Sequence, residues 1–196
     1  MKNNFEANKN QKPQRQTVIF KWNPAVSSYE FLRFLNNIAS EDGSMDWSVW
    51  DHDKIKQGDR FFMLKVGLGT CGIVSAGTIT SDPVPDEDWS GRGREVYYCD
   101  YYAEFMVNPE TLPIIGTARL QASIPDFDWT GGHSGVVLPV DQAKSLNQLY
   151  TAYLKENAPV FADRFDLMKK RRLINDQLYL ERKLRRKLIG DDPEED

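Results

Sequence analysis

Two apolar segments around a glycine-rich turn constrain the fold of this chain most strongly. Residues 60–67 (RFFMLKVG) and 72–81 (GIVSAGTITS) are rich in aromatic and β-branched side chains, and the turn GLGT at 67–70 separates them. Strand-forming segments joined by a short glycine turn are typical of a β-hairpin. The sequence therefore predicts an antiparallel pair of strands in the first half of the chain.

Further strands and helices are predicted on both sides of this hairpin. Ser27, followed by Glu30 three residues later, is a capping-box pattern that predicts the start of a helix at Ser27. Alternation or apolar runs predict strands, and 3.6-residue periodicity predicts helices. The strands are expected at 17–22, 46–50, 95–107 and 135–140, and the helices at 27–39, 117–125 and 140–157. The order β-α-β-β-β-β-α-β-α predicts an α+β fold, mostly antiparallel and barrel-like.

The length of 196 residues suits one domain with extensions. The predicted parts are a disordered basic arm at 1–16, a folded domain at 17–158, a basic amphipathic helix at 159–190 and an acidic tail at 191–196. The first part lacks the apolar stretch of a secretory signal, and the chain has no apolar run of eighteen residues. We therefore expect no membrane helix and a cytoplasmic location, with Cys71 and Cys99 as reduced thiols.

The charge is divided unevenly along the chain. Residues 22–160 carry 10 basic and 19 acidic side chains, whereas residues 161–190 carry 10 basic and 4 acidic ones. The basic clusters of the second part predict a phosphate-binding helix. Their members include Lys169, Lys170, Arg171, Arg172, Arg185 and Arg186. The alternative is a charged face on a helix that docks on the domain or pairs with a second copy in a homodimer.

The stretch DFDWTGGHSG at 126–135 is the strongest candidate for chemistry. A nucleophile elbow requires G-x-S-x-G, but Gly135 follows Ser134 directly and Val136 occupies the position of the last glycine. Adjacent residues of an extended chain point to opposite faces, so His133 is poorly placed to activate Ser134. The cluster at 51–53 (DHD) lacks the further His or Cys ligands of a metal site. We therefore expect no catalytic residues, no metal and no cofactor.

The motifs WSVW, QGDRFFMLKVGLGTCGIVSAGTITSDPVPD and GGHSGVVLPV occur in an order that resembles the EVE branch of the PUA-like superfamily, which is related to YTH and ASCH domains. The resemblance covers about residues 47–154. It departs from the usual pattern at Asp51, where an amide is expected. It implies a small pseudobarrel that binds RNA or DNA and encloses one flipped, modified base.

The resemblance also implies which residues line the base pocket. By position, Trp47, Ser48 and Trp50 would form a wall, Ile73 and Val74 the floor, and the segment with Asp128, Trp129, His133 and Ser134 a lid. Trp89, in a polar glycine loop, is a further lid or a surface anchor. Trp47 and Trp50 point to opposite faces of their strand, so we expect at most one of them in the pocket.

The residue types suit a flipped base independently of the resemblance. Such a base needs aromatic faces for stacking and fixed polar groups for its Watson–Crick edge. A carboxylate beside aromatic rings also favours a cationic methylated base. Arg92 and Arg94 are expected either to meet a phosphate or to pair with the neighbouring acids. The predicted function is a non-catalytic nucleic-acid reader; the alternative is a PUA-like protein that binds a small molecule or has a structural role.

Overall fold

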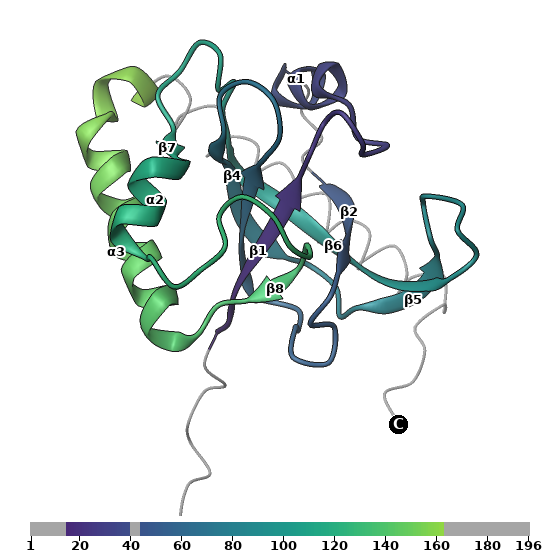
Figure 1. The fold of residues 1–196 in the computed structure, drawn as a ribbon. Helices are drawn as coiled ribbons and strands as arrows, with labels where there is room; N and C mark the ends of the chain where they lie inside the picture. The colour runs from purple at the N-terminus through teal and green to yellow at the C-terminus, as the bar shows by residue number, and fades with distance from the viewer. Residues whose placement is uncertain (1–14, 40–43, 163–196) are drawn as a thin grey trace, which may run out of the picture.

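The computed structural model describes residues 15–39 and 44–162, which form one curled sheet with helices on its faces (Figure 1). The elements run in the order β1 (Thr17–Trp22), α1 (Phe31–Ala39), β2 (Ser44–Val49), β3 (Arg60–Lys65), β4 (Gly72–Ile79), β5 (Val84–Glu87), β6 (Glu95–Met106), β7 (Ile115–Gly116), α2 (Thr117–Ser123), β8 (Val136–Val137) and α3 (Val140–Glu156). Most of the predicted helix at 159–190, with all of its basic cluster residues, lies outside the described residues, as do the predicted tail at 191–196 and residues 1–14 of the predicted arm at 1–16.

The sheet has eight strands, six of which follow the order β2-β6-β4-β3-β1-β8. Strand β5 pairs with β6, and β7 pairs with β4. The pair β1–β3 is parallel and the other pairs are antiparallel, including the predicted hairpin β3–β4. The predicted α+β pseudobarrel, mostly antiparallel and with flanking helices, is thus confirmed.

Alternating side chains of β1 divide the core in two. Val18, Phe20 and Trp22 belong to a cluster on one face, which α1 covers with Phe34. Ile19 belongs to the cluster on the other face, which α2 and α3 cover and which Leu120 and Leu146 help to fill. Figure 1 shows α2 and α3 side by side against that face. Because both faces of β1 are buried, this strand has few polar residues.

The start of α1 differs from the prediction. The helix begins at Phe31 instead of Ser27, and the Ser27 hydroxyl accepts a hydrogen bond from the backbone N–H of Tyr29, 3.1 Å away. A local turn of this kind competes with the capping geometry of a helix. Residues 23–29 are therefore a turn-rich connection, which is important for the site described below.

Other differences concern short strands and the end of the domain. Strands β5 and β7 were not predicted, and β8 has two residues where six were expected. These strands are shorter than the alternation that identifies a strand in a sequence. Phe161, beyond the predicted boundary at 158, is fully buried against Phe105 and Tyr153.

The segment between α2 and β8 crosses the sheet in front of β1 (Figure 1). The backbone N–H of Gly135 donates to the Ile19 carbonyl (2.9 Å), and the N–H of Trp50 donates to the Ser134 carbonyl (2.9 Å). The segment therefore joins β1 to the end of β2. This crossing creates the hollows that we consider as functional sites.

Candidate functional site

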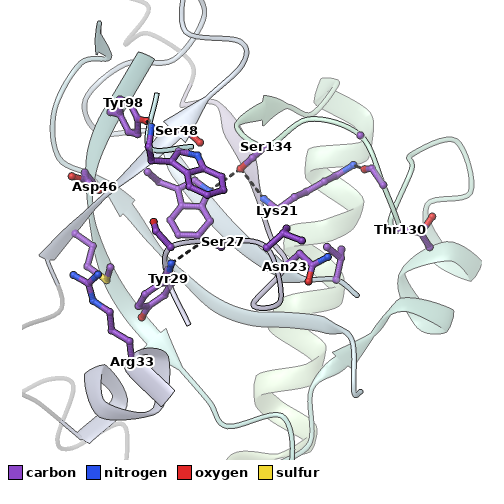
Figure 2. A pocket seen from close by; sticks show the side chains of 18 residues that line it. Lys21, Asn23, Ser27, Tyr29, Arg33, Asp46, Ser48, Tyr98, Thr130 and Ser134 are labelled. Atoms are coloured by element: carbon purple, nitrogen blue, oxygen red, sulfur yellow. Dashed lines mark hydrogen bonds between the residues drawn. The ribbon is translucent and has the colours of Figure 1, made fainter. Parts of the chain in front are cut away.

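A hollow of about 430 Å³ opens between β2, the connection from β1 to α1, and loop 130–134 (Figure 2). We call it the first hollow. It is lined by Lys21, Asn23, Val26, Ser27, Ser28, Tyr29, Arg33, Met45, Asp46, Trp47, Ser48, Val66, Trp89, Tyr98, Thr130, Gly131, Gly132 and Ser134. Its volume falls within the range of ligand pockets, about 300–1,000 Å³. The hollow is lined by four aromatic side chains and by nine polar or charged ones.

The Ser134 hydroxyl holds three segments together at the inner end of this hollow. Its oxygen accepts hydrogen bonds from the indole N–H of Trp47 (2.7 Å) and from the backbone N–H of Lys21 (2.9 Å). A serine oxygen has two lone pairs, so both are occupied and the O–H proton remains to be donated. Within residues 15–39 and 44–162 no acceptor for this proton is found. The partners of Ser134 among the described residues are therefore hydrogen-bond donors, and none of them is a base that could activate the hydroxyl.

Lys21 is a half-buried cation at the edge of the first hollow. Its ammonium donates hydrogen bonds to the carbonyl oxygens of Asp128 (2.7 Å) and Gly131, and it lies 4.9 Å from the centre of the Phe127 ring. Burial lowers the pKa of Lys21, and the negative charge of Asp128 opposes this shift. Because an ammonium group has three N–H donors, one donor remains for a ligand.

Tyr29, Arg33 and Asp46 complete the polar side of the first hollow. Burial raises the pKa of the Tyr29 phenol to about 12, so this group is neutral at physiological pH. The Arg33 guanidinium lies 5.8 Å from the centre of the Tyr29 ring, and the Asp46 carboxylate is exposed on β2 (Figure 2). The hollow thus combines a buried phenol ring with one exposed charge of each sign.

A second hollow of about 490 Å³ adjoins the first and shares Ser48, Trp89, Gly132 and Ser134 with it. It is lined in addition by Val49, Trp50, His52, Asp88, Arg94, Glu95, Val96, Tyr97 and His133. Two stacked ring pairs lie here. Trp50 and His133 are 3.6 Å apart between ring centres with an interplanar angle of 7°, and His52 and Tyr97 are 3.6 Å apart at 5°.

The loop between β5 and β6 carries Trp89, which borders both hollows and is 48% exposed. The buried Asp88 carboxylate anchors this loop by accepting hydrogen bonds from the Ser90 backbone N–H (2.9 Å) and from Arg94 Nε (2.5 Å). The Ser90 N–H in particular, with the Arg94 guanidinium beside it, lowers the pKa of Asp88 to about 2. Arg94 therefore forms the ion pair that was one of its two expected roles, while Arg92 is exposed on the same loop.

The structure brings several predicted pocket residues together, but it divides them between two hollows. Trp47 lines the first hollow and Trp50 lines the second, in agreement with their opposite directions on β2. Ser48, Trp89 and Ser134 border both. His133 lines the second hollow through its stack on Trp50.

Four predicted pocket residues lie elsewhere. Ile73, Val74 and Trp129 are buried in the core, where the Trp129 indole N–H donates to the Ile124 carbonyl (2.9 Å). They line neither hollow, because their strands and turn pack under the helices. The Asp128 carboxylate caps its own turn by accepting from the N–H groups of Thr130 and Gly131, both at 2.9 Å. Ile73 and Val74 therefore do not form the expected pocket floor, and Asp128 and Trp129 do not form the expected lid.

The tripeptide Asp-Trp-Ser/Thr occurs at 46–48, 88–90 and 128–130, and it forms a local turn at the second and third of these sites. Asp88 and Asp128 each accept a hydrogen bond from the backbone N–H two residues later, which forms an Asx turn. Trp89, which follows Asp88, is exposed, whereas Trp129, which follows Asp128, is buried. The motif therefore marks a turn and does not by itself mark a binding residue.

Sequence reasoning missed the contribution of the connection from β1 to α1. Lys21, Tyr29 and Arg33 line the first hollow in the place that the glycine hairpin was expected to occupy. Lys21 gave a weak signal of its position at a site, because it is the single charged residue of β1 and the other residues of this strand are apolar side chains and one Thr. Tyr97 of the second hollow belongs to an aromatic run in β6 and has no such signal.

In the described part of the chain, no group of three or more His, Cys, Asp or Glu side chains is arranged to hold a metal ion. A bilayer-spanning helix is also not found among these residues. Cys99 is buried and Cys71 half-buried, both as free thiols. Burial raises the pKa of the Cys99 thiol to about 12, so it is not a reactive thiolate at neutral pH.

Comparisons with known proteins found similar solved structures, whereas no family model and no curated protein matches this chain. A Pseudomonas putida protein has a TM-score of 0.47 and 16% identity over 68% of this chain and 98% of its own. The YTH domain of Zygosaccharomyces rouxii MRB1, in complex with N6-methyladenosine RNA, has a TM-score of 0.37 and 15% identity over 70% and 88%.

Human THYN1, in complex with 5-methylcytosine-containing DNA, has a TM-score of 0.35 and 13% identity over 55% of this chain and 74% of its own. The fold and the two hollows define the class of this protein as an α+β pseudobarrel with adjoining aromatic-lined pockets.

Proposed function

We propose that this domain binds a strand of RNA or DNA and holds one of its bases in the first hollow. The observation that carries the proposal is the Ser134 hydroxyl, whose oxygen is occupied by Trp47 and Lys21 and whose proton remains to be donated. A fixed donor in an aromatic hollow is suited to an acceptor on the edge of a planar heterocycle. Trp47 contributes its ring as a wall, since its N–H is already bonded.

The Asp46 carboxylate supplies the complementary acceptor. It lies on β2 next to Trp47 and lines the same hollow, so it can accept from an exocyclic amine of the base. A negative charge near aromatic rings also stabilises a base that carries a positive charge after methylation. Support for a modified base comes from this pairing of a carboxylate with aromatic rings in the first hollow.

The phosphate groups of the strand would meet cations around the hollow. Lys21 retains one donor at its edge, and the Arg33 guanidinium lines it from α1. Arg92 on the exposed loop is a further candidate, and the basic clusters at 169–172 and 185–186 remain proposed phosphate contacts. Such contacts position a strand without reading its sequence.

The proposal is tested by fluorescence anisotropy with labelled single-stranded RNA and DNA octamers that contain one methylated or one unmodified base. Asp46→Asn is expected to weaken binding of the octamer with a cationic methylated base about tenfold, because hydrogen bonds to a charged group contribute about 1.5–3 kcal/mol. Asp126→Asn, at an exposed carboxylate outside both hollows, is the matched control and should bind as the wild type does. The proposal is wrong if the wild-type chain binds none of these strands at low salt.

A further inference from the structure

The second hollow has no role in the function proposed above, although its walls are well suited to an aromatic ligand. The stacked pairs Trp50–His133 and His52–Tyr97 both line it. In each pair one face of a ring is covered by its partner. The Trp50 side chain is 59% exposed, so its uncovered face is accessible. A planar heterocycle stacks on such a platform with little dependence on its identity.

The charges around the second hollow do not prevent the binding of a base. Asp88 is neutralised by Arg94, with 2.5 Å between Oδ2 and Nε. The Glu95 carboxylate is exposed at the border and offers an acceptor for an exocyclic amine. This distribution favours bases with amino groups.

The border shared by the two hollows offers a place for a phosphate. Gly132, with φ +79°, is in the left-handed region, and a Cβ added to it would lie 3.2 Å from the Lys21 ammonium nitrogen. The backbone N–H groups of Gly132 and His133 have no acceptor among the residues that the structure describes. Successive backbone N–H groups beside a left-handed residue are a common anion-binding arrangement. A cation and two available N–H donors therefore lie where both hollows meet.

We infer that the second hollow takes the base adjacent, on the same strand, to the base held in the first hollow, with the phosphate between them at Gly132 and Lys21. This inference rests on the proposed function, because it needs a strand that already occupies the first hollow. It adds that the domain holds a dinucleotide step. Trp89, Ser48 and Ser134 then lie between the two bases, since they border both hollows.

The test compares adenosine 5′-monophosphate with the dinucleotide adenylyl-(3′→5′)-adenosine by isothermal titration calorimetry on the full chain. The dinucleotide is expected to bind about 5- to 150-fold more tightly, which is the range that one additional stacked base contributes. Trp50→Ala should abolish most of this advantage while the monophosphate affinity stays as in the wild type. Leu68→Ala, an 84% exposed apolar residue on the β3–β4 turn, is the matched control and should leave both affinities unchanged.

The outcomes separate the inference from the function on which it rests. Equal affinities of the wild type for the two nucleotides would overturn the inference and leave the first hollow as a single-base site. A parallel loss of both affinities in Trp50→Ala would also overturn it, because one hollow would then serve both ligands. Absence of binding for both nucleotides and for the octamers would overturn the proposed function together with the inference. Lys21→Met should reduce the dinucleotide advantage if the phosphate lies beside this ammonium.

Discussion

Among the acidic groups that border the hollows, Asp88 has the most strongly shifted pKa. Its pKa lies at about 2, below the ordinary value of 3.8, mainly because the Ser90 backbone N–H and then the Arg94 guanidinium favour the carboxylate. A group whose pKa is lower in the folded state stabilises the fold above its unfolded pKa, and this contribution is lost as the pH falls through the folded pKa. The stabilising contribution of Asp88 is therefore complete above about pH 4 and declines towards pH 2.

Asp88→Asn tests this expectation by urea denaturation at several pH values. The difference in free energy of unfolding between wild type and variant should be constant from about pH 7 to pH 5 and should shrink as the pH is lowered from about 4. Asp126→Asn is the control, because this carboxylate is exposed outside the loop. A difference that stays constant down to about pH 3 would show that the ionised form of Asp88 does not anchor the loop.

Single tryptophans show how far sequence reasoning reaches at this scale. The opposite directions of Trp47 and Trp50 follow from strand alternation, and the structure places them in two different hollows. Trp89 and Trp129 each follow an aspartate and lie in similar turns, yet Trp89 is 48% exposed and Trp129 is fully buried. Trp129 is buried in the core cluster that α2 and α3 cover, whereas Trp89 lies on the loop between β5 and β6, so the shared tripeptide does not distinguish them.

At the scale of elements, loop 130–135 is held where it crosses β1 and reaches β2. The carbonyl of Gly135 accepts from the Asp51 N–H (3.0 Å), and its own N–H donates to Ile19. A Cβ at Gly135, where φ is +70°, would lie 2.3 Å from the Cα of Val49. We therefore expect that Gly135→Ala displaces the loop from β2 and opens the border between the hollows.

The expected loss in free energy of unfolding for Gly135→Ala is about 3 kcal/mol or more, from left-handed strain of about 1–2 kcal/mol plus backbone overlap. Gly91→Ala is a matched control, because Gly91 has the same φ of +70° and nothing within 4 Å of an added Cβ. It should cost the strain alone. Equal losses in thermal or urea denaturation of the two variants would mean that the close approach to Val49 is relieved without displacing the loop.

Elements with a long, regular pattern were predictable and short ones were not. Strand β1 and the hairpin β3–β4 have the predicted positions, and α3 begins at the predicted Val140. The two-residue strands β7 and β8 depend on pairing with β4 and β1, so their backbone geometry is set by partners rather than by their own side chains. The Ser27–Glu30 pattern failed as a cap because the Ser27 hydroxyl is used within a preceding turn.

For the whole molecule, the position of the site follows from the order of the strands. The first hollow combines residues that are more than 100 positions apart, such as Lys21 and Ser134. Strand β1 lies between the glycine hairpin β3–β4 and the loop 130–134 that leads into β8. The resemblance implied the observed fold class, but it placed Ile73 and Val74 of the hairpin in the pocket floor, and both are buried in the core. Only the assembled sheet shows that the connection between β1 and α1 occupies that position instead.

The distribution of charge over the whole chain leads to a final prediction. The domain at 22–160 is acidic, whereas residues 161–190 carry 10 basic side chains, so most phosphate contacts of a long strand are expected from that extension. A variant with glutamine at six basic positions should show a shallower dependence of log K on log salt concentration for a 20-nucleotide strand. The positions are Lys169, Lys170, Arg171, Arg172, Arg185 and Arg186.

The same variant should bind adenosine monophosphate as the wild type does, because the residues that line the first hollow all lie between positions 21 and 134. Each phosphate contact that is removed lowers the slope by about 0.7 for single strands. A slope that does not change would show that the basic extension does not contact the strand. The alternatives of docking on the acidic domain or pairing with a second copy would then account for its charge, and sedimentation velocity of the variant would distinguish them, since loss of a dimer halves the mass of the particle.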